Sequence, residues 1–349
     1  MTWREEPVAV AIQELKTLTQ AIEGVADRKI VYVGEYHDKN SHHAVQLEVI
    51  KNLHRKNPKL AVGMEMFQRP YQGVIDDYIN GRIEEREFLK KSEYFERWGF
   101  DYNLYKPIID FARAAKIPVV ALNIRREIVD KVGKEGLDSL SSDEKKEIPA
   151  QLDFSDAAYR EKLEKIFKEH KGNSERKFEF FFQAQVLWDE TMAMSIDQYL
   201  KKEPESRMVV LAGQGHLAYG SGIPKRAFRR NGFPHGTLLN DADPARQIGD
   251  YVVIPQALEG KTSPKLMVAL KESKETVLIT DLPEDSIARK AGLKAGDVIR
   301  SLDNEPMRSI SDIKIALFYK NSGDSVKVTA VRKRFLLGER ELTFDIKLP

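Results

Sequence analysis

The stretch IVYVGEYHD, residues 30–38, joins an apolar, β-branched run to a glycine and a group of polar side chains. Residues 30–33 predict a strand covered on both faces, because a strand with one exposed face would alternate polar and apolar residues. Comparable runs recur at residues 60–64, 118–122, 208–212 and 251–254, with longer helical patterns between them. This alternation predicts an α/β domain whose mostly parallel sheet is flanked by helices.

Polar residues follow four of these strands. Glu35 and His37 come after the first strand, Glu65 after the second, Asn123 after the third and His216 after the fourth. Ligands of open α/β sheets bind outside the carboxyl ends of the strands, so these side chains predict a functional site at that edge. Two histidines and two glutamates can hold a divalent metal, with His37, Glu65 and His216 as ligands, or act as acid and base.

The helical pattern over residues 178–200 supports the same site. Its apolar stripe repeats at spacings of three and four, and Gln185 and Asp189 stand in the middle of it. Buried polar groups need partners, so we expect both side chains to face the site and, with Asn123, to contact a bound ligand. The alternative is that the stripe tips toward solvent at this point.

A charge-rich stretch at residues 125–177 interrupts the alternation. It predicts a helical insertion that covers one end of the sheet as a lid, or else a surface hairpin without a role. Residues 256–264 contain glycine, threonine, serine and proline and are typical of a linker. We therefore predict an α/β domain over residues 1–255 and a second domain over residues 256–349.

The second domain contains SIARKAGLKAGDVI, residues 286–299, which resembles the pattern of PDZ domains. The resemblance implies a small β-rich domain that binds an extended peptide or a protein C-terminus by strand addition. Backbone amides of residues 265–268 would capture the terminal carboxylate, although Met267 replaces the usual glycine of that loop. An internal strand as ligand, or a purely structural role, is the alternative.

Several motifs of the first domain occur together. They are GEYHD at residues 34–38, MEMF at 64–67, WGFDYNLYKP at 98–107, ALN at 121–123, QVLWDETMA at 185–193 and GQGHLAYGSGIP at 213–224. In combination they resemble the ChaN-like haem-binding uptake family of the Tiki superfamily, whose bacterial members often carry a PDZ domain. The resemblance maps His37, Glu65 and His216, with Glu35 beside them, onto a core shared with metalloproteases and erythromycin esterases.

The same resemblance implies a haem cofactor whose iron is held by a tyrosine. Tyr102, Tyr105 and Tyr219 lie in the matching motifs, and the alternative for each is a place in the core. A phenolate ligand needs a lowered pKa, which a nearby cation favours. Haem also needs a large apolar slot, for which a homodimer is one source. The resemblance further implies a cell-envelope, periplasmic location.

The amino-acid composition limits which classes of binding partner we expect for this chain. The formal net charge is +2 over 349 residues, which does not favour nucleic acid or a membrane surface as partner. The basic run Lys225, Arg226, Arg229 and Arg230 is expected to form a solvated face. The absence of cysteine excludes disulfides and thiolate chemistry.

We expect no transmembrane segment. The first residues do not read as a signal peptide, so a cytoplasmic location stays open.

Three functions follow from these patterns. The first is a haem or iron-porphyrin binding protein of iron uptake, with the PDZ module docking a partner. The second is a metal-dependent hydrolase, an esterase or peptidase, with Glu35 or Glu65 as ligand or general base; a metal-free acid–base version is a variant. The third is a scaffold whose PDZ domain alone recruits a partner. The family resemblance favours the first.

Overall fold

The computed structural model describes residues 12–170, 177–243, 248–334 and 338–349. The chain forms two compact units: residues 1–82 with 107–259, and residues 83–106 with 260–349. The first is called the α/β unit and the second the PDZ unit. The division predicted at residue 255 does not anticipate that residues 83–106 group with the C-terminal part.

The α/β unit is built on a six-stranded parallel sheet in the order β3-β2-β4-β1-β5-β6. The strands are β1 Ile30–Glu35, β2 Leu60–Gln68, β3 Val119–Asn123, β4 Arg207–Gly213, β5 His235–Asn240 and β6 Tyr251–Val253. The central strands are buried along almost their whole length. The predicted α/β class is confirmed, with β5 as a strand that the apolar pattern did not mark, since His235, Gly236 and Thr237 dilute it.

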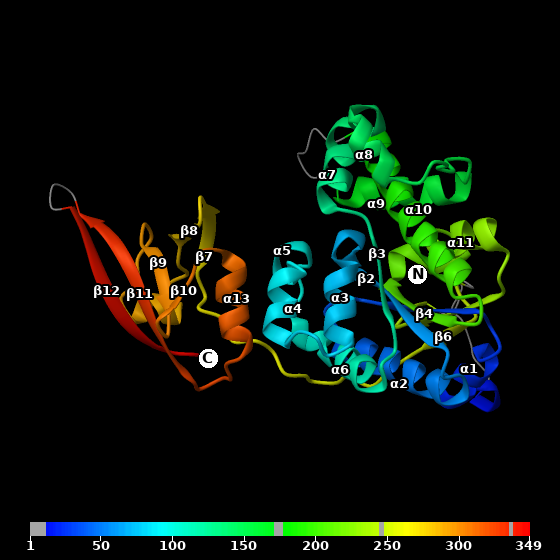
Figure 1. Ribbon diagram of the computed structural model, residues 1–349, viewed down its shortest axis with the longest axis horizontal. Coiled ribbons are helices and arrows are strands. Elements are labelled where there is room, and N and C mark those ends of the chain that lie inside the picture. The colour runs from blue at the N-terminus through cyan, green and yellow to red at the C-terminus, as the bar shows by residue number, and fades with distance from the viewer. Residues whose placement is uncertain (1–11, 171–176, 244–247, 335–337) are drawn as a thin grey trace, which may run out of the picture. The chain divides into compact units, whose positions relative to one another are not determined.

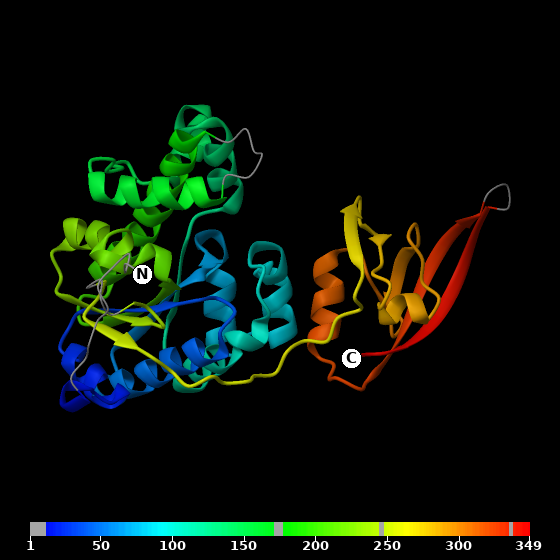
Figure 2. The same cartoon turned by 180° about the vertical axis from the view of Figure 1, so that it is seen from behind.

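Helices cover both faces of this sheet (Figure 1; Figure 2 from behind). The helices of this unit are α1 Leu18–Val25, α2 Asn40–Lys56, α3 Gln72–Ile79, α6 Lys106–Ala115, α7 Arg126–Glu135, α8 Ser142–Glu147, α9 Ala157–His170, α10 Phe178–Lys202 and α11 Ile223–Asn231. Of these, α7 and α9 pack, among the described residues, on α10 and not on the sheet. On one face, Met192 and Ile196 of α10 and Ala227 of α11 share a core with Tyr32 and Val210 of the strands. On the other face lie α1 and α2.

The strand order reverses between β1 and β4. From β1 the chain moves outward through β2 to β3, then returns to place β4 between β2 and β1, and continues past β1 to β5 and β6. The connections after β1 and β4 therefore run in opposite directions along the sheet, which is the point at which open α/β sheets bind their ligands. The segments that follow β1 and β4 carry His37 and His216.

The PDZ unit contains an antiparallel sheet in the order β12-β11-β9-β8-β7, with β10 paired to β9. Its strands are β7 Ala269–Ser273, β8 Thr276–Asp281, β9 Val298–Leu302, β10 Glu305–Pro306, β11 Ser325–Arg334 and β12 Gly338–Lys347; its helices are α4 Glu85–Lys91, α5 Tyr94–Arg97, α12 Ile287–Lys290 and α13 Ile310–Phe318. Gly292 and Gly296 have φ of +106° and +91° at the turns predicted for them. The β-rich PDZ-like fold is confirmed.

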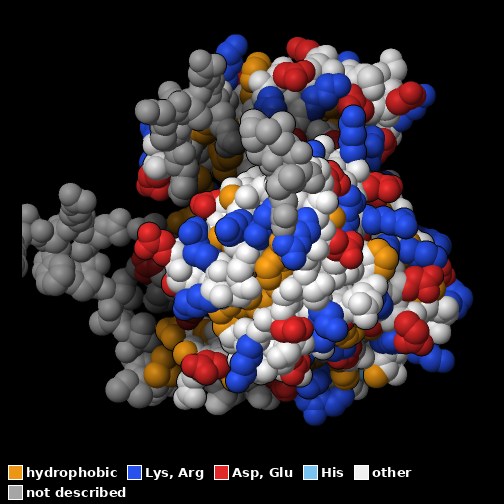
Figure 3. Space-filling model, turned by 90° about the vertical axis from the view of Figure 1, so that its left-hand side faces the viewer, with side chains coloured by type: hydrophobic (Ala, Val, Ile, Leu, Met, Phe, Trp, Pro, Cys, Tyr) orange, Lys and Arg blue, Asp and Glu red, His pale blue; other side chains and the backbone are white. Residues whose placement is uncertain are grey.

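Charged side chains cover much of the surface. On the face displayed in Figure 3, acidic and basic side chains are interspersed with apolar and neutral ones. The chain has 56 basic and 54 acidic residues and a formal net charge of +2, and on this face neither sign predominates.

Candidate functional site

The site begins with a histidine–carboxylate pair after β1. Glu35 is the last residue of the strand and is buried, and His37 Nδ1 donates a hydrogen bond to Glu35 Oε1 over 2.6 Å. Two residues of α2 hold the other carboxylate oxygen: Gln46 Nε2 donates to Glu35 Oε2 over 2.7 Å, and His43 Nδ1 lies 3.1 Å from it. The hydrogen bond between His37 Nδ1 and Glu35 fixes the imidazole ring of His37, so that its Nε2 atom points away from Glu35.

The charges of this pair stabilise each other. Burial acts to raise the pKa of Glu35, but hydrogen bonds from His37 and His43 outweigh it and lower this pKa to about 2. Burial acts to lower the pKa of His37, yet the carboxylates of Glu35 and Glu65 raise it above its usual value. Glu35 is therefore ionised at neutral pH, and its charge favours the imidazolium form of His37.

A second histidine–carboxylate pair lies after β4. His216 Nδ1 donates to Asp189 Oδ1 of α10 over 2.6 Å, and the hydroxyl of Tyr159 on α9 donates to the other oxygen of Asp189. The ring of Trp188 packs edge-on against His216 at 5.1 Å between centroids. Burial acts to lower the pKa of His216, but Glu65 and Asp189 raise it to about 9. His216 is thus an imidazolium at neutral pH.

Glu65 lies between the two pairs. It belongs to β2 itself, where its carboxylate accepts a hydrogen bond from the backbone N–H of Gly213 over 2.7 Å. Its other oxygen is 3.6 Å from His216 Nε2. A Cβ on Gly213 would stand 2.9 Å from His37 Nε2. The structure therefore brings His37, Glu65 and His216 together, and it needs a glycine at position 213 to do so.

The metal site predicted at His37, Glu65 and His216 was compared with the geometry of the described residues. In the described part of the chain, no group of three or more histidine, cysteine, aspartate or glutamate side chains is placed so that it could hold a metal ion. The two histidines each engage a carboxylate through Nδ1, and one oxygen of Glu65 is engaged by Gly213. The geometry brings two histidine–carboxylate pairs next to Glu65, and the 3.6 Å between His216 Nε2 and Glu65 Oε1 is longer than a hydrogen bond.

The three amide and carboxyl residues predicted to contact a ligand have different places. Asp189 is buried and holds His216, as described above. Asn123 ends β3, and its side chain donates to the carbonyl of Glu65 over 2.9 Å, so it supports the strand. Gln185 is only partly buried on α10 and has no hydrogen bond to the two histidine pairs or to Glu65.

The three tyrosines predicted as haem ligands also separate. Tyr219 is 49% exposed and has a φ of +67° in the loop after β4. Tyr102 and Tyr105 are fully buried in the PDZ unit, where Tyr102 packs against the rings of Tyr94 and Phe318. Their motif positions suggested the site, but aromatic packing places both in the core of the PDZ unit.

Tyr219 borders a hollow of about 690 Å³ between α9 and the loop after β4. Tyr159, Lys162, Ile166, Ser221 and Lys225 also line it. Lys162 donates to the carbonyl of Gly215 over 3.1 Å, and its ammonium lies 5.4 Å from the centroid of the Tyr219 ring. Burial lowers the pKa of Lys162. Sequence reasoning missed Tyr159 and Lys162, although Tyr159, Leu163 and Phe167 repeat at a helical spacing that marks a buried face.

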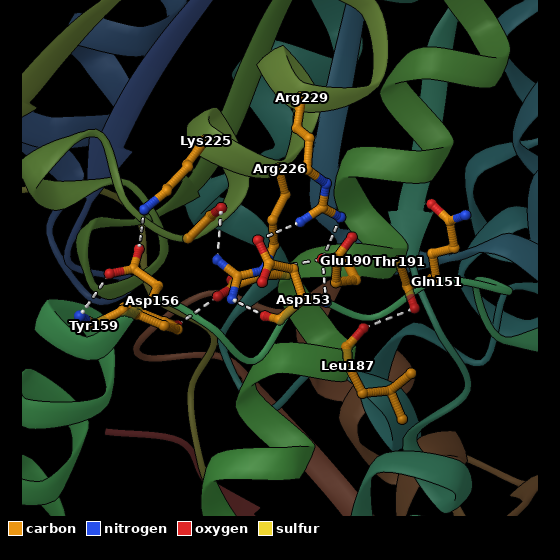
Figure 4. A network of polar contacts seen from close by, with 12 residues as sticks. Gln151, Asp153, Asp156, Tyr159, Leu187, Glu190, Thr191, Lys225, Arg226 and Arg229 are labelled. Atoms are coloured by element: carbon orange, nitrogen blue, oxygen red, sulfur yellow. Dashed lines mark hydrogen bonds and ion pairs between the residues drawn. The ribbon is translucent and has the colours of Figure 1, made fainter.

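The insertion that carries α9 is fastened by the basic run of α11 (Figure 4). Glu190 of α10 is fully buried and pairs with Arg226, Arg229 and Arg230, while Arg229 also pairs with Asp153. The expectation of a solvated face is corrected here: Arg226 is 2% exposed and stacks on the ring of Tyr159. These cations are used inside the unit to hold the insertion over the site.

Comparison with known proteins agrees with this architecture. The family described as "Haem-binding uptake, Tiki superfamily, ChaN" matches residues 21–227, and the PDZ domain matches residues 264–348. The chain therefore belongs to the ChaN-like haem-binding family and carries a C-terminal PDZ domain. No helix in the described ranges has both the length and the apolar character needed to cross a membrane.

Individual relatives are distant. ChaN of Campylobacter jejuni, solved with cofacial heme binding, is 17% identical over 68% of this chain and 92% of that one, with a TM-score of 0.56, which shows the shared fold. An erythromycin esterase, EreC, covers 64% of this chain and 71% of its own, with 14% identity and a TM-score of 0.38, too low to argue from. Protein RETICULATA-RELATED 5, chloroplastic, of Arabidopsis thaliana is 26% identical over 247 residues. The match covers 64% of this chain but only 32% of that curated relative.

Proposed function

We propose that the α/β unit binds haem or a related iron porphyrin in the uptake of iron or haem in the cell envelope, with Tyr219 as the iron ligand. The observation that carries this proposal is the position of Tyr219: it is the exposed member of the three candidate tyrosines and borders the hollow beside α9. Family membership supplies the class of cofactor. When bound, the iron of the porphyrin would bind and exchange axial ligands. The residues that line the hollow would hold the porphyrin.

Part of the lining of the hollow suits this cofactor. Ala158 and Ile166 offer apolar surface, and Lys162 and Lys165 would pair with acidic groups of a porphyrin. Asp156, Glu161 and Glu169 line the same hollow. A homodimer that completes the slot stays a prediction.

A haemin titration of the purified chain tests this proposal. We expect a saturable Soret band, and we expect Tyr219→Phe to weaken binding by roughly tenfold and to remove the phenolate-to-iron charge-transfer band. Tyr319→Phe is the matched control, since Tyr319 is 41% exposed in the PDZ unit and its loss should change neither signal. A titration without saturation, or an unchanged spectrum in Tyr219→Phe, would contradict the proposal.

We also propose that the PDZ unit docks a partner through an extended peptide with a free C-terminus. Strand β7 is an edge of its sheet, so it has one side available for strand addition. Met267 adopts a φ of +57°, the left-handed conformation that a glycine in this loop would take. The loop therefore keeps the backbone conformation of a glycine-containing loop although methionine stands at position 267.

A hydrolase is the second candidate, and the convergence of two histidines, His37 and His216, on Glu65 favours it. Glu65 would take a proton from water as general base, and His216, charged because its pKa is about 9, would donate a proton to the leaving group as general acid. Such a reaction uses the residues as they stand, without a metal.

Hydrolysis of p-nitrophenyl acetate by the purified chain tests this second function. Activity should resist EDTA, should fall by about 100-fold in His216→Gln and should decline above pH 9 as His216 loses its proton. His235→Gln changes a histidine at the other end of the sheet and should leave the rate unchanged. Activity that EDTA removes and zinc restores would favour the metal-dependent version instead, and a rate equal to that of buffer with and without zinc would exclude this esterase activity.

A further inference from the structure

Residues 83–106 contain α4 and α5 and are called the hairpin segment. They lie in the sequence of the α/β unit but pack on α13 of the PDZ unit. The ring of Tyr102 meets that of Phe318 edge-on at 5.4 Å, Lys90 pairs with Asp312 over 3.4 Å, and Arg86 pairs with Glu305. The hairpin segment thus adds a layer to the side of α13.

The hairpin segment is also hydrogen-bonded to the extended segment that leads into the peptide loop. Asp101 accepts the backbone N–H of Ser263 over 2.6 Å and the hydroxyl of the same residue over 2.9 Å. Asn103 donates to the hydroxyl of Ser263 over 3.0 Å. Because Ser263 lies two residues before Lys265, these bonds fix the start of the loop at residues 265–268 against the hairpin segment.

A groove of about 490 Å³ lies among these parts. Leu266 of the loop and Ile313 and Leu317 of α13 give it two apolar walls, as expected between α13 and the edge strand β7. Phe95 and Phe100 of the hairpin segment line the same groove. Two large aromatic side chains from a segment about 160 residues upstream therefore form a third wall.

The polar groups of the groove suit a terminal carboxylate. The backbone N–H groups of Leu266, Met267 and Val268 have no hydrogen-bond partner within the described residues. The cations among the lining residues are Lys265 and Lys314, and the one acid there, Asp101, has both oxygens engaged by Ser263. A row of free amides beside two lysines attracts an anion.

We propose that the hairpin segment completes the peptide groove of the PDZ unit, and that Phe95 and Phe100 make it select a protein C-terminus whose last side chain is large and apolar. This inference rests on the proposed peptide docking and adds its specificity. A large apolar side chain would bury against the two rings, whereas an alanine would leave that wall uncovered and gain little from it.

The test uses the whole chain and immobilised ten-residue peptides with free C-termini, randomised at the last four positions. The chain should select leucine, phenylalanine or tryptophan at the last position. For the best selected peptide, Phe100→Ala should weaken binding by roughly tenfold, and for the same peptide ending in alanine by less than about twofold. Phe228→Ala, which removes an exposed phenylalanine of the α/β unit, is the matched control and should change neither affinity.

The outcomes separate the two proposals. If the chain selects no C-terminal sequence, peptide docking itself fails. If selection occurs but Phe100→Ala leaves the last-residue preference unchanged, or weakens both peptides equally, docking stands and the role of the hairpin segment is overturned. Phe100→Leu keeps an apolar side chain and should retain the preference, and melting curves of both variants verify that each remains folded.

Discussion

Gly213 shows how one residue decides the site. The carboxylate of Glu65 accepts its N–H, and the ring of His37 lies where a Cβ would otherwise stand. An alanine would have to displace His37, because its Cβ would be 2.9 Å from Nε2 of that ring. The strand-end rule identified His37, Glu65 and His216 from sequence, but nothing in the sequence showed that the glycine between them carries the geometry.

The charge of His216 gives a pH-dependent stability. Its pKa is raised from 6.5 to about 9 in the folded protein, so its contribution is fully present below pH 6.5 and is lost as pH rises through 9. We expect wild type to exceed His216→Gln by about 3 kcal/mol in free energy of unfolding at pH 6, and by little at pH 10. Calorimetry of both proteins over this range measures the difference.

His235 provides the control for this pH dependence. Burial lowers its pKa, so its effect on stability appears as pH falls below 6.5 and is absent at higher pH. The difference between wild type and His235→Gln should therefore be constant between pH 7 and 10. A constant difference for His216→Gln over pH 6 to 10 would contradict a raised pKa at that position.

Among the elements, α11 and α10 are joined by charge. Glu190 is the shared partner of three arginines, and removal of its charge leaves these cations close together without compensation. We expect Glu190→Gln to lower the free energy of unfolding by about 3 kcal/mol, as for other buried pairs that lose one partner. Urea unfolding of the whole chain, followed by far-UV circular dichroism, measures it.

Glu179→Gln is the matched change at an exposed pair. Glu179 pairs with Arg160 on the surface, where both side chains are solvated, so its loss should cost under about 1 kcal/mol. Equal losses for the two variants would mean that the network around Glu190 does not fasten the insertion. The sequence showed only a basic run on α11; its acidic partners lie on other elements, so the pairing depends on the tertiary fold.

At the scale of the whole molecule, the sequence predicted the two folds, but it did not predict that residues 83–106 belong to the PDZ unit. The apolar runs of the sheet and the glycine turns of the PDZ pattern are local signals, and both folds follow from them. The position of residues 83–106 depends on contacts with α13 that are remote in sequence, such as that between Tyr102 and Phe318. The same cause explains why Tyr102 and Tyr105, which lie in a motif of the family resemblance, are core residues.

The split membership of the PDZ unit also sets an order of events during synthesis. The ribosome releases α4 and α5 long before residues 260–349 exist, so the face that will cover α13 has no native partner at first. Chains are made at about 5–20 residues per second, which leaves this apolar face waiting for roughly ten seconds or more. We expect this face of the nascent chain to stay uncovered by its native partner until α13 has been synthesised.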